Sequence, residues 1–126
     1  MLASNEAMAT IAVKDIAKAK SFYENKLGLK KQSEEDEHGV ATYKSGSSTI
    51  VVYESEFAGT NKATSATWSV GDELESIVKR LKDAGVPFEH YDMPGLERKG
   101  EIHIADGFRA AWFRDPDGNI LHINSM

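Results

Sequence analysis

The chain has 126 residues, of which 40% are hydrophobic and 28% charged, a composition that fits one globular domain and excludes a disordered or fibrous class. Fifteen Lys and Arg residues against twenty Asp and Glu residues give a net charge of −5, with the positive residues scattered. We therefore expect neither nucleic acid nor a membrane as a partner, since both need a concentrated basic surface.

The first half of the chain has the pattern of a strand, a helix and three strands. A short, partly β-branched apolar run at residues 8–13 predicts a buried strand. Asp15 is expected to cap an amphipathic helix that ends at Gly28. Three further strands are predicted at residues 29–33, 40–45 and 48–55, with a solvated acidic turn at 34–39 that contains His38 and a linker at 57–63.

The same pattern begins again after the linker. A strand at residues 64–70 is followed by a helix for which Asp72 is the expected N-cap and Glu75 its capping-box partner. Gly85 is expected to end this helix. The remaining elements are predicted as a strand at 86–91, a loop at 92–100, an extended piece at 102–105 and a hairpin built on the turn Asp115-Pro116-Asp117-Gly118-Asn119.

The spacing of the caps and helix ends shows that the two halves repeat. Gly28 and Gly85 are separated by the same number of positions as Asp15 and Asp72. Strand, cap and helix of the first half therefore superimpose on those of the second half without a gap.

The last strands of the two halves match only if the second half contains an insertion. Glu54 and His122 are separated by eleven more positions than the helix ends, and the extra residues can be assigned to the loop around 92–107. We therefore predict an α+β fold with two tandem βαβββ modules, at about 7–56 and 64–126, in a single domain spanning 1–126. Each sheet would have one face without a helix, so the two sheets are expected to enclose a cleft.

Two stretches carry a resemblance to a known family. They are the segment 13–29, which contains Val13-Lys14-Asp15-Ile16 and Ser21-Phe22-Tyr23-Glu24-Asn25-Lys26-Leu27-Gly28-Leu29, and the segment Phe113-Arg114-Asp115-Pro116-Asp117-Gly118-Asn119. With these, nearly the whole chain resembles the vicinal oxygen chelate superfamily, which groups glyoxalase I, bleomycin-resistance proteins and extradiol dioxygenases. The resemblance implies the fold but not an activity, because members share the scaffold and differ in chemistry.

The resemblance also implies positions for a divalent metal, on the first and last strand of each module. In this chain those positions are Met8 and Ser65 on the first strands, and Glu54 and His122 on the last. A Met thioether is too soft for such an ion, and two protein ligands are too few for a catalytic zinc site. We therefore expect no cofactor, and Glu54 and His122 as the ligands if a metal does bind. Thiolate ligands, like disulfides and thiolate nucleophiles, are excluded because the chain has no cysteine.

Strand alternation predicts which side chains line the cleft. If Glu54 faces the cleft, Ile50 and Val52 do so too, while Val51 and Tyr53 face the helix.

On the other strands, Thr10 and Thr67 are expected in the cleft and Trp68 on the helix side. The side to which Trp112 points stays open, since a register shift of one residue would reverse it. His90 and His103 are expected to be partly exposed, although either could turn toward the cleft. The candidate ligand-binding residues are Glu54, His122, Val52, Thr10, Thr67, Trp112, Phe108 and His103.

The leading functional prediction is a protein that binds and sequesters a small molecule, as the resemblance to bleomycin-resistance proteins implies. An aromatic or cationic organic ligand is expected, since aromatic side chains border the cleft and Glu54 would favour a cation. The alternatives are a metal-dependent lyase, isomerase or dioxygenase, and a metal-free enzyme with Glu54 or His122 as the base. A third alternative is a cleft filled by side chains in a protein that acts through a partner.

The remaining expectations concern assembly and location. The resemblance implies a two-fold homodimer. No apolar run reaches the length of a membrane span, and the first residues do not form a basic segment followed by an apolar one. We therefore expect a cytoplasmic protein.

Overall fold

The computed structural model describes residues 2–32 and 39–126, so most of the predicted acidic turn, including His38, lies outside the described residues. The chain divides into two compact units, Met1–Asn61 (unit 1) and Lys62–Met126 (unit 2), which are described separately below. The boundary lies within the segment 57–63, which contains no helix or strand. No helix in the described ranges is both long and apolar enough to cross a membrane.

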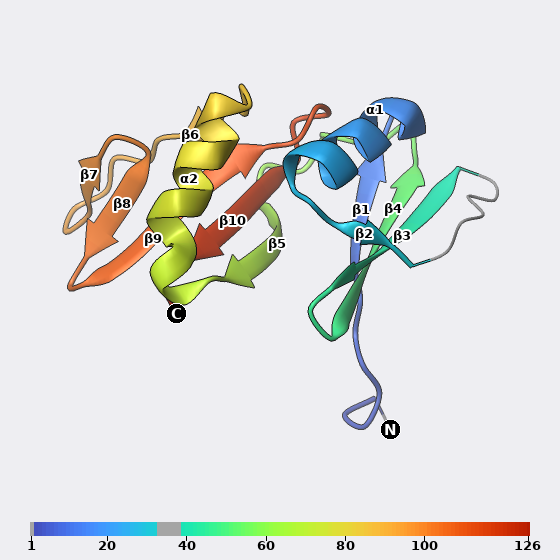
Figure 1. Cartoon of the computed structure of the whole chain (residues 1–126), viewed down its shortest axis with the longest axis horizontal. Coiled ribbons are helices and arrows are strands. Elements are labelled where there is room, and N and C mark those ends of the chain that lie inside the picture. Colours follow the sequence, from blue (N-terminus) through green and yellow to red (C-terminus); the bar gives the residue numbers. More distant parts are fainter. Residues whose placement is uncertain (1, 33–38) are drawn as a thin grey trace. The chain divides into compact units, whose positions relative to one another are not determined.

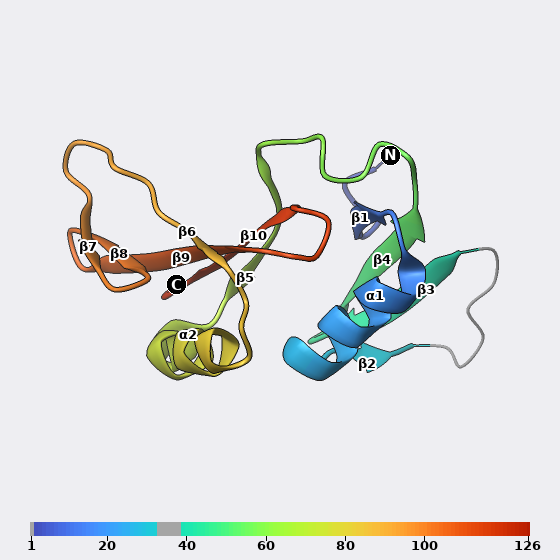
Figure 2. The ribbon, with the colours of Figure 1, turned by 90° about the horizontal axis from the view of Figure 1, so that it is seen from above.

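Unit 1 consists of one mixed sheet with a helix over one of its faces (Figures 1 and 2). The strands lie in the order β1-β4-β3-β2, with β1 parallel to β4 and the other neighbours antiparallel. This confirms the predicted order of strand, helix and three strands. The elements are β1 (Ala9–Val13), α1 (Ile16–Lys20), its π-helical continuation η1 (Ser21–Lys26), β2 (Lys30–Lys31), β3 (Val40–Ser45) and β4 (Ser48–Glu54).

The helix of unit 1 begins and ends as its sequence predicts. The Asp15 side chain accepts hydrogen bonds from the backbone N–H groups of Ala17 (2.9 Å) and Lys18 (3.3 Å), which otherwise lack helical partners. Gly28 follows the helix with a positive φ of 71°, a conformation that favours glycine. Buried Tyr23 of η1 stacks on buried Tyr43 of β3, which joins the helix to the sheet.

Unit 2 also has one mixed sheet with one helix on it, plus an additional hairpin. The strands lie in the order β5-β10-β9-β8-β7, with β6 also paired to β9 and β5 parallel to β10. The elements are β5 (Thr64–Ser69), the 3-10 turn η2 (Gly71–Glu73), α2 (Leu74–Asp83), β6 (Phe88–Glu89), β7 (Glu97–Lys99), β8 (Ile102–Ala105), β9 (Phe108–Arg114) and β10 (Ile120–Asn124).

Two local predictions for unit 2 are wrong. Residues 97–99 of the predicted loop form β7, because they pair with β8 across the turn at Gly100. Asp72 is not an N-cap, since it lies inside η2 and neither η2 nor α2 has a side-chain cap hydrogen bond. Glu75, its expected partner, instead forms an ion pair with Arg109 of β9.

The hairpin of β9 and β10 is closed by the predicted turn. Asp115, which is 3% exposed, accepts hydrogen bonds at Oδ1 from the backbone N–H groups of Asp117 (2.9 Å) and Asn119 (2.8 Å). Its Oδ2 also accepts a bond from the Asn119 side-chain amide (2.8 Å). Gly118 supplies the positive φ, at 89°. The turn therefore fixes the register of the two strands.

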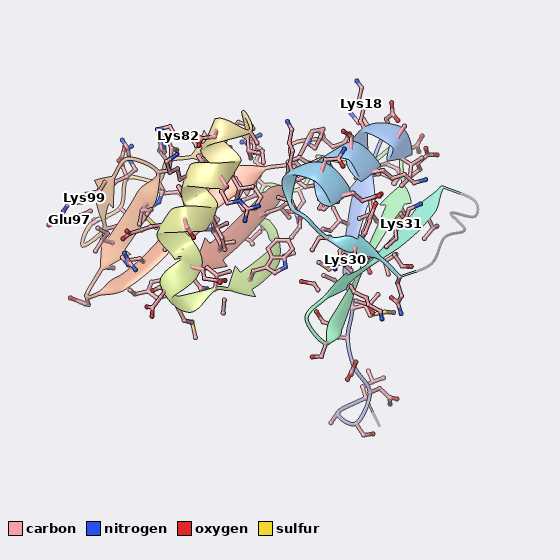
Figure 3. All side chains as sticks on the ribbon, in the orientation of Figure 1. Lys18, Lys30, Lys31, Lys82, Glu97 and Lys99 are labelled. Carbon is pink, nitrogen blue, oxygen red and sulfur yellow. The ribbon has the colours of Figure 1, made fainter. Side chains whose placement is uncertain are left out.

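Positive side chains are distributed over both units rather than gathered on one element. Lys18 lies on α1, Lys30 and Lys31 on β2, Lys82 on α2 and Lys99 on β7 (Figure 3).

Candidate functional site

The face of the unit 2 sheet opposite α2 carries most of the predicted ligand-binding residues of this unit. Figure 2 shows α2 on one side of this sheet. Arg109 of β9 pairs with Glu75 of α2, so its side chain marks the helix side. Residues alternate along a strand, so Trp112 points to the opposite, helix-free face. His122 of β10 lies opposite both Trp112 and Thr67 in the ladder, and partners across a ladder share a face.

Four rings meet on this helix-free face, and we call them the ring cluster: Tyr91, His103, Trp112 and His122. The rings of Trp112 and His122 stack with centroids 4.5 Å apart and an interplanar angle of 25°. Tyr91 and His103 each meet Trp112 edge-on at 5.0 Å. Trp112, whose facing the sequence left open, therefore lies beside His122, and both side chains are half-buried.

His122 is held as a neutral ring by its hydrogen bonds. Its Nδ1–H donates to the Ala111 carbonyl (3.1 Å), and its Nε2 accepts from the Asn124 side-chain amide (3.3 Å). The amide orientation follows from its oxygen, which accepts from the Met126 backbone N–H (3.1 Å). Burial lowers the pKa of His122, as does nearby His103, while the Ala111 carbonyl partly offsets this.

His103 is fully buried, so the prediction of partial exposure is wrong for this residue and holds only for His90, which is exposed. The backbone N–H of Tyr91 donates to His103 Nε2 (2.9 Å), which assigns the ring proton to Nδ1. Among the described residues, this buried Nδ1 makes no hydrogen bond of normal geometry, although the Ala110 carbonyl acts on the ring and favours its proton. Burial is the main reason why the pKa of His103 is lowered.

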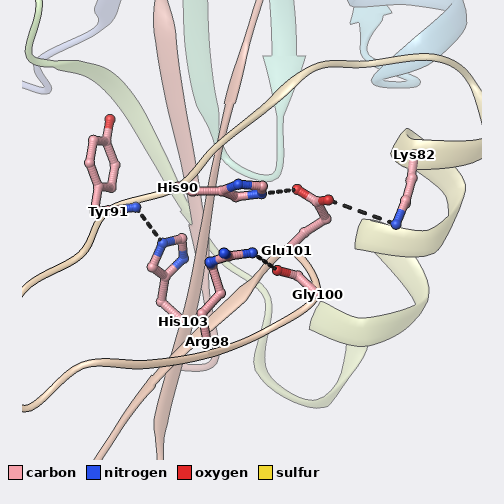
Figure 4. A network of polar contacts seen from close by, with 7 residues as sticks. All are labelled: Lys82, His90, Tyr91, Arg98, Gly100, Glu101 and His103. Atoms are coloured by element: carbon pink, nitrogen blue, oxygen red, sulfur yellow. Dashed lines mark hydrogen bonds and ion pairs between the residues drawn. The ribbon is translucent and has the colours of Figure 1, made fainter.

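A polar network flanks His103 (Figure 4). The Glu101 carboxylate forms a hydrogen bond with His90 Nε2 (2.8 Å). It also forms an ion pair with Lys82, whose Nζ is 3.7 Å away. These contacts join the turn between β7 and β8 to the end of β6 and to α2. Arg98, which lies opposite His103 in the ladder, donates to the Gly100 carbonyl (2.9 Å).

In unit 1 the predicted facing of β4 is wrong. Val52 is fully buried on the helix side, in the same layer as Tyr43, whose hydroxyl donates to Glu24 of η1. Glu54 follows on the same side, and its Oε1 accepts a hydrogen bond from the Ile16 backbone N–H at the start of α1 (3.3 Å). Glu54 thus supplements the helix cap, and Val52 belongs to the core.

The helix-free face of unit 1 instead carries Thr10 and Val51, which are ladder partners. In unit 2 the ladder partner of Thr67 is His122. Because Thr10 and Thr67 occupy equivalent positions in the repeat, their ladder partners are also equivalent, so Val51 is the counterpart of His122. The predicted match of Glu54 with His122 is therefore wrong. Matching Val51 with His122 makes the insertion in unit 2 longer by three residues, fourteen instead of eleven, and β7 and β8 lie within it.

These positions do not fit a divalent metal of the kind the family resemblance implies. The Glu54 side chain is bonded to the backbone at the start of α1, and Nε2 of His122 already accepts a hydrogen bond. Met8 and Ser65 are not suitable ligands for a hard ion. Across residues 2–32 and 39–126, no group of three or more His, Asp or Glu side chains is placed to hold a metal.

Comparison with known proteins identifies the family. A model of the Glyoxalase/Bleomycin resistance protein/Dioxygenase superfamily matches residues 7–123, so the chain belongs to this superfamily. No curated protein matches the chain significantly.

Solved structures share the fold at low sequence identity. An integron cassette protein from the Halifax Harbour sewage outfall metagenome has 18% identity and a TM-score of 0.72, covering 98% of this chain and 99% of its own. Fosfomycin resistance protein FosX from Listeria monocytogenes has 17% identity and a TM-score of 0.70, with 96% and 92% covered. Lactoylglutathione lyase from Agrobacterium tumefaciens has 16% identity and a TM-score of 0.69, also with 96% and 92% covered.

Unit 2 brings together Thr67, Trp112, His122 and His103 of the predicted residues, and Phe108 lies on the same face with 39% of its surface exposed. The candidate ligand-binding residues predicted from the sequence do not include Tyr91 or Asn124. Asn124 was detectable, because it lies two residues after His122 and alternation places both on one face. Tyr91 lies in a segment that, from the sequence, could line or cover the opening, but alternation could not place its ring because the residue lies beyond the end of β6.

Proposed function

We propose that this protein binds a small planar aromatic molecule on the ring cluster of unit 2, without a metal. The observation that carries the proposal is the half-exposed stack of Trp112 on His122, surrounded by two further rings. Aromatic pairs contribute about 0.5–1.5 kcal/mol each beyond the area that they bury. A planar ligand that adds to the stack gains this contribution, whereas an aliphatic ligand of equal size gains burial alone.

The charges near the cluster favour a neutral ligand or a delocalised cation over an anion. Nε2 of His122 and of His103 accepts a hydrogen bond and so carries no proton, and Glu89, the ladder partner of Trp112, forms an ion pair with Arg114. Arg98 and Asp92, which act on the His103 ring, have opposite charges. A cationic ligand would be attracted by the electron-rich Trp112 ring. The Glu54 carboxylate, which led to the expectation of a cation, instead supplements the cap of α1 in unit 1.

A second candidate is a metal-free enzyme in which His122 removes a proton from its substrate. The observation that favours it is the unprotonated Nε2, which carries a single long hydrogen bond from Asn124, together with the lowered pKa of His122. The ring could accept a proton at Nε2 while Nδ1–H stays on the Ala111 carbonyl. His122→Gln would then abolish turnover completely, beyond the partial loss of ligand affinity expected from removing one ring of the stack.

Ligand binding can be tested with the full chain and a panel of planar heteroaromatic compounds, matched in size to saturated analogues. Binding is followed by thermal shift and by calorimetry. We expect some planar compounds and none of the saturated ones to raise the melting temperature. Trp112→Leu should abolish this effect, whereas Trp68→Phe on the helix side should retain it. The proposal is overturned if no compound of the panel binds, or if Trp112→Leu binds the compounds as well as the natural chain does.

Metal content, assembly and location belong to the same proposal. Stoichiometric metal in freshly purified protein would contradict metal-free binding. The homodimer and the cytoplasmic location stay predictions from the sequence. Light scattering tests the first, and a monomeric mass would contradict it.

A further inference from the structure

We propose that residues 90–96, the Tyr91 segment, form a cover over Trp112 that His103 holds closed at neutral pH and releases when its ring is protonated. The segment lies between the end of β6 and the start of β7 and contains no helix or strand. Residues 92–95 within it are exposed. The sheet ladder therefore does not fix it in place.

The first step of the argument is the hydrogen bond that ties Tyr91 to His103. The Tyr91 backbone N–H donates to Nε2 at 2.9 Å, which requires a lone pair on that nitrogen (Figure 4). A second proton on the ring would occupy Nε2 and place one donor against another. Protonation of His103 therefore removes this bond and replaces it with repulsion.

The second step concerns the other contacts of the segment. Within the described part of the chain, its ring contacts all involve His103 or Trp112: Tyr91 meets both, and His90 meets His103 at 6.5 Å. Among the described residues, the segment also has a polar contact with the β7–β8 turn, between His90 and Glu101. The contacts of Tyr91 therefore meet at His103 and Trp112, and the bond to His103 is the one that a second proton on this ring removes.

The third step concerns the groups that face the His103 ring. Burial has the largest effect and opposes protonation of the ring, as do Arg98 of β7 and His90 of the segment. The Ala110 carbonyl and Asp92 favour protonation. His122 lies beyond Trp112, and burial lowers the pKa of its ring as it does that of His103. In the closed form, in which the Tyr91 N–H is bonded to His103, the ring therefore resists a second proton.

Opening changes this balance because it exposes the ring to water. An exposed histidine has a pKa near 6.5, so the open form takes up a proton at a pH where the closed form does not. By linkage, acidification then increases the population of the open form.

The consequence for ligand binding rests on the proposed function, whereas the release itself does not. When Tyr91 leaves, the part of the Trp112 ring that it contacts becomes accessible. A planar ligand would then reach the stack more easily at acidic pH. A ligand that instead stacks on Tyr91 would be bound more weakly there.

Amide hydrogen exchange of the Tyr91 N–H, measured by NMR in the full chain, tests the release without any ligand. Rates are taken at about pH 7.5 and about pH 5 and corrected for intrinsic exchange. If the open form titrates at 6.5 and the closed form stays neutral, opening increases by up to about 30-fold between these values. Equal protection at both values would overturn the proposal.

Three variants assign the effect to one ring. His103→Gln keeps an acceptor for the Tyr91 N–H but cannot titrate, so its protection should be independent of pH. His90→Gln and His122→Gln, which remove the neighbouring imidazoles, should retain the pH dependence. A dependence that persists in His103→Gln would contradict the assignment.

A measurement on the unmodified chain covers the case in which His103→Gln does not fold. The ring signals of His103 and the Tyr91 amide signal are followed together during a pH titration. We expect both sets of signals to change with one shared midpoint, at a pH below 6.5. Different midpoints for the two groups would overturn the proposal. Failure of the ligand panel with a positive exchange result would refute the proposed function alone.

Discussion

Three aspartates provide a graded test of how the structure uses carboxylates, because the same substitution has different consequences at each. Asp115 is buried and accepts hydrogen bonds from Asp117 and Asn119 within the β9–β10 turn. Hydrogen bonds to a charged group contribute about 1.5–3 kcal/mol each and are not additive, so we expect Asp115→Ala to cost about 4 kcal/mol. That is a large part of the stability of a small domain, at about 5–15 kcal/mol.

The other two aspartates serve as matched controls. Asp15 caps α1 through two backbone N–H groups, and Asp15→Ala should cost about 1 kcal/mol. Asp72 lies inside η2 without a side-chain cap bond, so Asp72→Ala should change stability by less than about 0.5 kcal/mol. Urea unfolding followed by circular dichroism gives the three values. An Asp72→Ala loss equal to that of Asp15→Ala would refute the assignment of the caps.

Two further predictions concern stability. The pKa values of His103 and His122 are lowered in the folded chain, so their contribution is complete above pH 6.5 and decreases as the pH falls from 6.5 toward those lower values. The loss of folding free energy reaches at most about 1.4 kcal/mol per pH unit for each ring. If a variant with Gln at both positions loses as much stability on acidification as the natural chain, this prediction is wrong. Tyr43→Phe removes a buried hydroxyl that donates to Glu24 (2.9 Å) and should cost about 1–2 kcal/mol in urea unfolding, and an unchanged midpoint would argue against that bond.

Features with a local cause were predictable from the sequence. The turn at 115–119 is specified by its own Asp, Pro, Gly and Asn side chains. The cap at Asp15 and the helix end at Gly28 likewise depend only on neighbouring residues. The constant spacing of the repeat then transfers the helix end to Gly85, which also has a positive φ. Such signals establish the order of elements and the fold class.

The facing of β4 was not predictable because both of its sides are apolar. Ile50 and Val52 alternate with Val51 and Tyr53, so hydrophobic pattern gives no preference for either face. The register with β1 decides it, since it is Thr10 that pairs with Val51. Matching the two modules through polar residues, instead of through the ladder, then made the inferred insertion too short.

The ring cluster was only partly predictable for a similar reason. Thr67 and His122 follow from alternation on adjacent strands, but Trp112 needed the hairpin register. The burial of His103 depends on the inserted hairpin of β7 and β8 and on the Tyr91 segment, neither of which has a repeat partner to guide inference. Long-range contacts of this kind are set by tertiary packing.

The most direct test of the account uses the indole N–H signals of the two tryptophans in an NMR titration with the planar compound that gives the largest thermal shift. We predict that the Trp112 indole and the His122 ring signals move together on ligand addition, while the Trp68 indole stays in place. Movement of Trp68 alone, or saturable binding that leaves both tryptophans unchanged, would contradict a binding site on the helix-free face of unit 2.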